Sequence, residues 1–206
     1  MKRGKLFTMS GPSGVGKGTI VRELLKLSPE LRLSISCTTR QPRPAESEGV
    51  HYFFVTKDRF EQMTAAGEML EWANVHGNCY GTPRSYVEKM LSEGHDVLLE
   101  IDVQGSLQVL KNMPETVGIF ILPPTRAELV RRLSGRGTET KEQLQTRIRN
   151  AEAEVREAEK FKYLVVNANL GEAVRQVRSI IEAEHLHSRR ELLENLYNEF
   201  EEAHSK

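Results

Sequence analysis

A glycine-rich loop between a short apolar segment and an amphipathic stretch constrains this chain more than any other feature. The apolar segment is Leu6–Met9, and GPSGVGKG follows at residues 11–18. Ile20, Val21 and Leu24 then recur at helical spacing. In this order of strand, loop and helix, backbone N–H groups surround a phosphate and the helix N-terminus adds positive potential. The sequence therefore predicts a nucleoside triphosphate site rather than a glycine-rich turn that only links two elements.

Lys17 is expected to supply the point charge for the β- and γ-phosphates of the bound nucleotide. The usual pattern has Ser or Thr directly after this lysine, whereas this chain has Gly18, with Thr19 one place later. We therefore expect Thr19 at a phosphate rather than at a metal ion. Magnesium is expected to be held through phosphates and waters, and its direct protein ligands stay open, with Glu100 and Asp102 as candidates. The predicted nucleotide-binding positions of the loop are Gly11, Pro12, Ser13, Gly14, Val15, Gly16, Lys17, Gly18 and Thr19.

Three later apolar runs are each followed by a stretch with helical spacing, and they lie at Val97–Ile101, Gly118–Leu122 and Tyr163–Val166. Strands that alternate with helices in this way form a parallel sheet, because each crossover helix returns the chain to the same edge and covers one face. The sequence therefore predicts an α/β fold with a doubly wound parallel sheet of the phosphate-loop NTPase type.

Two inserted segments interrupt this alternation. Residues from about 33 to 83 alternate apolar and polar side chains and include aromatic and β-branched runs, which predicts a small strand-rich lobe for the phosphate acceptor. Residues from about 133 to 159 begin with glycines around an arginine and continue into a charged helix, which is typical of a basic helical lid. We expect one domain over residues 4–184, with a core of 4–32, 84–132 and 160–184, and a charged helical tail over 185–206.

The 206 residues carry 29 acidic and 29 basic side chains, and this balance argues against a nucleic-acid partner. No stretch reaches the roughly 20 apolar residues of a membrane span, and no signal-peptide pattern is present. We therefore expect a cytoplasmic protein with no membrane partner and no obligate protein partner. Cys37 and Cys79 are expected as buried free thiols without a metal, and Trp72 is expected in the core.

Arg40 and Arg43 lie three residues apart on the segment TTRQPR, which also carries hydroxyl groups. Planar guanidinium groups suit a bidentate grip on a phosphate dianion. Further along the chain, Glu71 and Thr82 supply a carboxylate and a hydroxyl on flanking segments. These residues predict an anionic second substrate, and the alternative is that the two arginines are ordinary solvated surface residues.

With these segments in this order, the chain resembles the guanylate kinase family over residues 6 to 183. The resemblance implies that TTRQPR binds the phosphate of GMP, that Glu71 accepts from the guanine N1–H and amino group, and that Thr82 contacts O6. Guanine presents two adjacent donors to a carboxylate, whereas adenine presents an acceptor at N1. The residues that the resemblance assigns to GMP are Ser36, Arg40, Arg43, Tyr52, Glu71, Tyr80, Thr82 and Asp102.

The resemblance also covers the basic lid, and it implies that Arg132, Arg136 and Arg147 approach the phosphates of ATP. Asn167 matches the adenine side of the family's donor site, although residues 168–169 are Ala-Asn where an acidic pair is common. ATP rather than GTP as the donor is therefore implied only by the resemblance. The expected catalytic residues are Lys17, Arg40, Arg136 and Arg147.

The expected reaction converts ATP and GMP to ADP and GDP, with dGMP as a further acceptor and with Mg²⁺. A monophosphate oxygen is already anionic at neutral pH, so in-line transfer needs no general base, and none is evident among the six histidines. Two alternatives stay open: a kinase of AMP, a pyrimidine monophosphate or a phosphorylated ribose, and a scaffold module that binds phosphorylated peptides. Glu71 with Thr82 argues against the first alternative, and Lys17 in an intact loop argues against the second.

Overall fold

The central layer of the molecule is a parallel β-sheet. The computed structural model describes residues 3–75, 77–134 and 140–186, together with residues 193, 196–198, 200 and 201. Within this part of the chain, five strands pair in parallel in the order β2-β7-β1-β8-β9. They are β1 (Leu6–Ser10), β2 (Arg32–Leu33), β7 (Val97–Glu100), β8 (Val117–Leu122) and β9 (Tyr163–Val166). The predicted α/β fold is confirmed, but the sequence does not predict β2, because a two-residue edge strand has no periodic signal.

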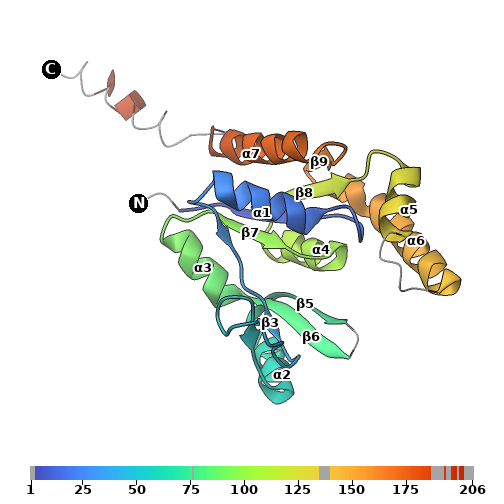
Figure 1. The fold of residues 1–206 in the computed structure, drawn as a ribbon. Helices are drawn as coiled ribbons and strands as arrows, with labels where there is room; N and C mark the ends of the chain where they lie inside the picture. The colour runs from blue at the N-terminus through green and yellow to red at the C-terminus, as the bar shows by residue number, and fades with distance from the viewer. Residues whose placement is uncertain are drawn as a thin grey trace.

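Helices cover both faces of this sheet (Figure 1). Side chains alternate along β1, so Phe7 and Met9 enter a core shared with α1 and α7, whereas Leu6 enters the opposite core with α3 and α4. The four helices are α1 (Lys17–Leu27), α3 (Arg84–Ser92), α4 (Val103–Asn112) and α7 (Leu170–Leu186). The carboxyl ends of the parallel strands therefore meet at one edge, where open α/β sheets bind ligands.

A second, four-stranded sheet in the order β4-β3-β6-β5 projects from the core (Figure 1). Its elements are β3 (Cys37–Thr38), β4 (Phe53–Phe54), α2 (Lys57–Ala65), β5 (Met69–Val75) and β6 (Asn78–Pro83). These strands match the expected strand-rich lobe, except that Leu33 belongs to β2 of the central sheet. Cys37 is buried and Cys79 is half-buried, both are free thiols, and burial raises the pKa of Cys37 to about 11.

The prediction that Trp72 lies in the core is wrong, because its side chain is 44% exposed. Strand β5 has a register irregularity between Met69 and Glu71, and this irregularity leaves Leu70 and Glu71 both buried in succession. A β-bulge re-aims side chains in this way and is common beside active sites. The bulge thus turns Glu71 inward and leaves Trp72 on the outer face.

The lid expected from about 133 to 159 covers the last residues of α5, the whole of α6 and most of a short 3-10 turn, η1. Helices α5 and α6 lie beyond the end of the central sheet (Figure 1). They share a small core of Leu129, Leu133 and Ala151. Thr140 and Gln143 form a capping box that begins the second helix. The elements are α5 (Arg126–Ser134), α6 (Lys141–Arg156) and η1 (Glu157–Lys160). Arg136 lies outside the described residues, as does most of the tail, of which residues 193, 196–198, 200 and 201 are helical.

Among the described residues, no helix is both long enough and apolar enough to span a membrane.

Candidate active site

The phosphate loop requires glycine at particular positions because of its close contacts. Gly11 and Gly16 have positive φ angles of 146° and 98°. A Cβ atom on Gly11 would lie 2.4 Å from the carbonyl oxygen of Ile121, and one on Gly16 would lie 2.7 Å from Asn167 Nδ2. Lys17 Nζ donates to the carbonyl oxygen of Gly11 at 2.6 Å. The loop encloses an open hollow of about 1060 Å³ lined by Ser13, Gly14, Val15, Gly16, Lys17, Gly18, Thr19, Arg22, Glu100 and Arg132.

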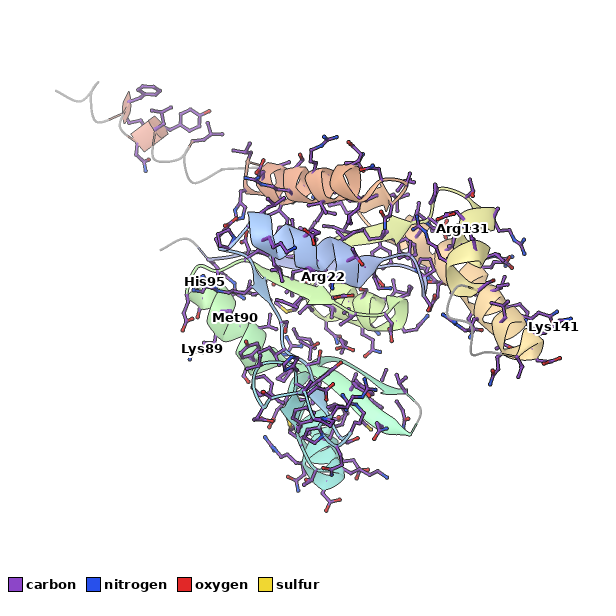
Figure 2. All side chains as sticks on the ribbon, in the orientation of Figure 1. Arg22, Lys89, Met90, His95, Arg131 and Lys141 are labelled. Atoms are coloured by element: carbon purple, nitrogen blue, oxygen red, sulfur yellow. The ribbon has the colours of Figure 1, made fainter. Side chains whose placement is uncertain are left out.

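Asn167 and Arg132 both donate hydrogen bonds to the backbone of the phosphate loop. Asn167 is buried and donates through Nδ2 to the carbonyl oxygen of Val15 at 2.8 Å. Arg132 donates to the same carbonyl oxygen at 3.2 Å and to the carbonyl oxygen of Asn167 at 2.9 Å, and its Nε donates to Glu128 at 2.7 Å. The neighbouring Arg131 projects outward from α5 (Figure 2). Arg132 therefore links the lid helix to the loop, whereas Arg131 does not.

Helix α6 reaches the phosphate loop at Ser13. Arg147 Nη2 donates to Ser13 Oγ at 3.3 Å. The backbone N–H of Ser13 donates to Glu154 Oε2, also at 3.3 Å. Arg147 and Glu154 lie seven residues apart, two helical turns, and so share one face of α6. Arg147 is expected at the phosphates, whereas Glu154 is not expected at the site, because it lies in a run of charged residues typical of a solvent-facing helix.

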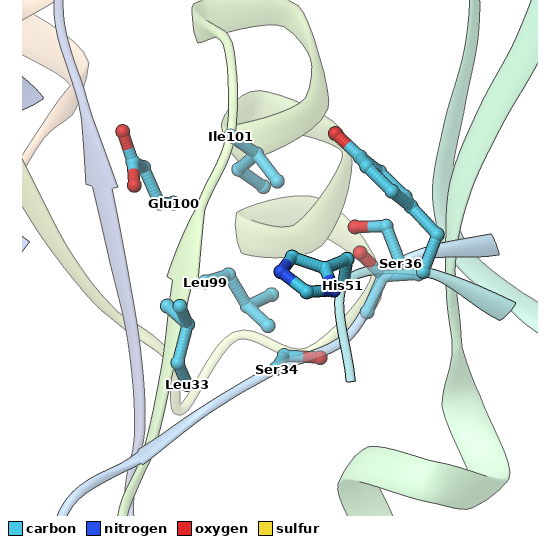
Figure 3. Close-up of a pocket in the computed structure, with 9 residues that line it drawn as sticks. Leu33, Ser34, Ser36, His51, Leu99, Glu100 and Ile101 are labelled. Carbon is cyan, nitrogen blue, oxygen red and sulfur yellow. The ribbon is translucent and has the colours of Figure 1, made fainter. Parts of the chain in front are cut away.

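A second hollow, of about 480 Å³, lies between the central sheet and the strand-rich lobe (Figure 3). It contains three residues that the resemblance assigns to GMP, namely Ser36, Tyr52 and Thr82. His51 and Ser34 also line it, and the sequence offers no pattern that distinguishes them. The full lining is Leu33, Ser34, Ser36, His51, Tyr52, Thr82, Leu99, Glu100 and Ile101.

Arg40 lies in a cluster of aromatic and acidic groups. Its Nη2 donates to both carboxylate oxygens of Glu46, at 2.8 and 2.9 Å, and its guanidinium carbon lies 5.6 Å from the ring centroid of Tyr52. Tyr80 stands edge-on to Tyr52, with 6.0 Å between ring centroids. The backbone N–H of Arg43 also donates to Glu46 at 2.9 Å. Arg43 is exposed to solvent. The Glu46 carboxylate thus contacts the same guanidinium that is expected to bind the anionic substrate. No pattern in the sequence indicates this role for Glu46.

Glu71 is the most deeply buried carboxylate of the candidate acceptor site, with 6% of its surface exposed. Thr82 Oγ1 donates to Glu71 Oε1 at 2.7 Å. Burial and, to a lesser extent, the nearby Asp102 carboxylate raise the pKa of Glu71 to about 7, and the hydrogen bond from Thr82 opposes this shift. The two residues that the sequence assigns to guanine are therefore in direct contact.

Helix α4 holds Glu71 and Asp102 in one rigid arrangement. Asp102 caps its N-terminus, because Oδ1 accepts from the backbone N–H of Gly105 at 2.7 Å. Gln108 pairs with both backbone groups of Trp72, at 3.2 and 3.1 Å, and Asn112 Nδ2 donates to the carbonyl oxygen of Leu70 at 2.9 Å. These contacts hold the β5 backbone on either side of Glu71. The sequence analysis misses Gln108 and Asn112, although their spacing of four places both on one helix face.

We expect Gly105→Ala to impair the acceptor site selectively. A Cβ atom there would lie 2.8 Å from Glu71 Oε2 and 3.4 Å from Asp102 Oδ1. The carboxylate must move, so the KM for the acceptor should rise about 10-fold or more, while the KM for the triphosphate stays constant. Steady-state kinetics with each substrate varied would measure this, with Gly171→Ala on α7 as the matched control. An unchanged acceptor KM would contradict the prediction.

Glu100 is a carboxylate that lines the hollow at the phosphate loop. A Cβ atom on Gly18 would lie 3.2 Å from Glu100 Oε1, so the glycine leaves room for this carboxylate. Burial raises the pKa of Glu100, and the Lys17 charge opposes the shift. Across the described ranges, no three His, Cys, Asp or Glu side chains gather closely enough to hold a metal ion. A magnesium ion here would need ligands from the nucleotide and from water.

Comparisons with known proteins agree with this geometry. The family model described as guanylate kinase matches residues 3–184. A guanylate kinase from Chelativorans sp. is 48% identical over 94% of this chain and 90% of its own length. One from Clostridium perfringens is 50% identical over 88% of this chain and 84% of its own length. The crystal structure of guanylate kinase from Anaplasma phagocytophilum superposes with a TM-score of 0.73 at 32% identity, covering 96% of this chain and 97% of that one.

Proposed function

Because the chain belongs to the guanylate kinase family and transfers phosphate from ATP to GMP, we propose that Glu71 and Thr82 select guanine and that the transfer is direct and in-line. The observation that carries the proposal is the buried Glu71–Thr82 pair at the candidate acceptor site. We further propose that dGMP is an acceptor, that Mg²⁺ is required, and that the strand-rich lobe and the α5–α6 lid are the acceptor-binding and donor-closing parts of one domain.

Selection of guanine follows from hydrogen-bond complementarity. An ionised Glu71 offers only acceptors, which match the N1–H and amino donors of guanine. The Thr82 hydroxyl, which donates to Glu71 Oε1, would turn its one proton to O6 when guanine binds. Adenine presents an acceptor at N1, so its N1 would face the buried carboxylate without a hydrogen to donate. An unsatisfied buried polar group costs about 1 to 3 kcal/mol, and more when it is charged. Glu71 would therefore discriminate against AMP mainly through the penalty on the wrong base.

The acceptor phosphate would bind at the cluster of Arg40, Tyr52 and Tyr80, with Arg43 beside it. The Arg40–Glu46 pair, in which Nη2 donates to both carboxylate oxygens, holds the guanidinium in place. A phosphate dianion would compete with the Glu46 carboxylate for that guanidinium. Arg40 is therefore positioned before the substrate arrives. Because the phosphate would replace the Glu46 carboxylate as its partner, the guanidinium would have an anionic partner both before and after binding.

For the transfer, this chain supplies position and positive charge rather than a base. A phosphate oxygen of GMP attacks the γ-phosphorus while the bond to the β-phosphate oxygen breaks, so ADP leaves and GDP forms. Lys17 and the loop N–H groups would stabilise the charge on the transferring group, and Arg147 would approach it from α6. Arg136 keeps its proposed role as a lid arginine on the ground of resemblance alone. A bound magnesium ion would neutralise phosphate charge.

An acceptor panel and a stereochemical assay together test the proposal. Purified protein with ATP and magnesium should release ADP with GMP and dGMP, and should do so far more slowly with AMP, CMP, UMP, dTMP and ribose 1,5-bisphosphate. ATP carrying a γ-phosphorus made chiral with oxygen isotopes should give inversion of configuration, because a single in-line displacement inverts the phosphorus. Retention would indicate a phosphoenzyme and would overturn the in-line mechanism. Equal turnover of AMP would overturn the role of Glu71.

We expect the KM for GMP to rise as the pH falls below about 7. Glu71 must be ionised to accept from guanine, and its pKa in the ligand-free protein is raised to about 7. Well below that pKa, the KM should rise about tenfold for each pH unit lost. The phosphate of GMP also titrates near pH 6, so the Glu71→Gln variant gives the baseline. A wild-type profile that parallels this baseline would contradict the prediction.

A further inference from the structure

An acidic side chain of the lid contacts the donor site, where the incoming ligand is itself an anion. Glu154 accepts a hydrogen bond from the backbone N–H of Ser13 at 3.3 Å, and Ser13 lines the hollow of the phosphate loop. Arg147, two turns earlier on α6, donates to the Ser13 hydroxyl at 3.3 Å. One lid helix therefore brings a positive and a negative group to the same loop residue.

Packing holds Glu154 at this position. Ala151 lies one turn before Glu154 on α6 and packs on Leu129 and Leu133 of α5. Leu133 in turn lies against the phosphate loop, because a Cβ atom on Gly14 would be 3.0 Å from its Cδ2. Apolar contacts thus hold the α6 backbone close to the loop. They place the Glu154 carboxylate beside Ser13 in addition to the 3.3 Å hydrogen bond.

The charge of Glu154 acts on the lysine of the loop. Burial lowers the pKa of Lys17, and Glu154 is the carboxylate that opposes this shift most strongly, ahead of Glu100 and Asp102. Burial also raises the pKa of Glu154 itself, and both the Ser13 N–H and the charge of Lys17 oppose that shift. The two side chains therefore stabilise each other's charge in the ligand-free protein.

We propose that Glu154, whose carboxylate contacts the phosphate loop at Ser13, weakens the binding of ATP and ADP. A triphosphate that enters the loop takes over the Lys17 charge and places its own negative charge close to the Glu154 carboxylate. Like charges at this range repel, so the carboxylate reduces the affinity for both nucleotides. The proposal rests on the donor site proposed above and adds a residue that opposes binding there.

The test uses Glu154→Gln, which removes the charge and keeps an oxygen that can accept from Ser13. Isothermal titration of the full-length protein with MgADP should give a Kd about 5-fold lower than that of the wild type, and added salt should reduce the difference. Glu152→Gln is the matched control. It lies on the same helix and loses the same charge, but its carboxylate accepts from Arg126 at 2.6 Å, at a distance from the loop. This control should leave the Kd unchanged.

A second readout excludes a purely structural effect of the substitution. In Glu154→Gln, the increase in melting temperature caused by MgADP should be larger than in the wild type, whatever the melting temperature without nucleotide. An unchanged or weaker ADP affinity in Glu154→Gln would overturn the proposal. A wild-type protein that binds neither ATP nor ADP would instead overturn the donor site itself, so the two failures are distinguishable.

Discussion

Lys17→Met should lower kcat/KM by about 10³-fold or more, because it removes the ammonium group of the phosphate loop. That factor corresponds to about 4 kcal/mol of transition-state stabilisation. In the ligand-free protein Lys17 Nζ donates to the carbonyl oxygen of Gly11 at 2.6 Å, so it already lies at the loop. Steady-state kinetics with ATP and GMP would measure the loss.

The stability of this variant should not follow its activity. Burial lowers the pKa of Lys17, so keeping the side chain charged reduces the stability of the folded protein at neutral pH. Methionine has a similar length and no charge, and we expect the melting temperature to stay constant or rise. Lys26→Ala is the matched control, because it lies at the other end of α1 in an exposed pair with Glu23. Near-normal turnover in Lys17→Met would contradict the mechanism, whatever its stability.

Glu71→Gln should reduce kcat/KM for GMP by about 10²-fold. Glutamine keeps one acceptor oxygen but places an NH₂ group against a donor of guanine, in a position that is 6% exposed. Water cannot relieve this donor–donor conflict, so the loss should appear mainly in the KM for GMP. The comparison of interest is with AMP, whose rate should fall much less or rise.

The control for this variant is Glu68→Gln, three residues before Glu71 in the chain, which removes an exposed carboxylate paired with Arg59. Its kinetics should match those of the wild type. The free energy of unfolding gives an independent readout. Because the folded-state pKa of Glu71 is raised to about 7 from 4.5, the ligand-free wild type loses stability as pH rises between these values. Glu71→Gln should lack this part of the pH dependence, and a variant that keeps both the dependence and the GMP preference would contradict the role of Glu71.

Part of the fold could be predicted because its signals are local. The phosphate loop has its glycines, the helix α1 has apolar residues at helical spacing, and the strands β7, β8 and β9 each have a short run of apolar residues. The edge strand β2 could not be predicted as part of the central sheet, and the sequence predicted strands around β3 and β4 without their two-residue lengths, because pairing with neighbours sets these features. The position of Trp72 could not be predicted either, because a bulge in β5 changes which side chains of the strand face the core, and the Trp72 indole lies on the outer face.

The candidate site divides in the same way. Lys17, Arg40, Glu71 and Thr82 stand out in the sequence because each belongs to a segment whose residue types suit one piece of chemistry. Glu46, Gln108 and Glu154 do not stand out, because their roles come from partners six or more residues away: the Arg40 guanidinium, the Trp72 backbone and the Ser13 N–H. A single Glu or Gln on a charged helix has the same local pattern whether it faces solvent or an active site.

The sequence by itself therefore determined the fold class and the phosphate loop, because apolar periodicity and backbone curvature at glycine are local properties. Its resemblance to the guanylate kinase family indicated the two substrates. The tertiary structure alone decided which charges meet. It places Glu154 against the loop, Glu46 on Arg40, and Glu71 in a buried site where its pKa rises to about 7. Burial and charge pairing depend on distances across the fold, and these are set by the packing of distant segments rather than by neighbours in the chain.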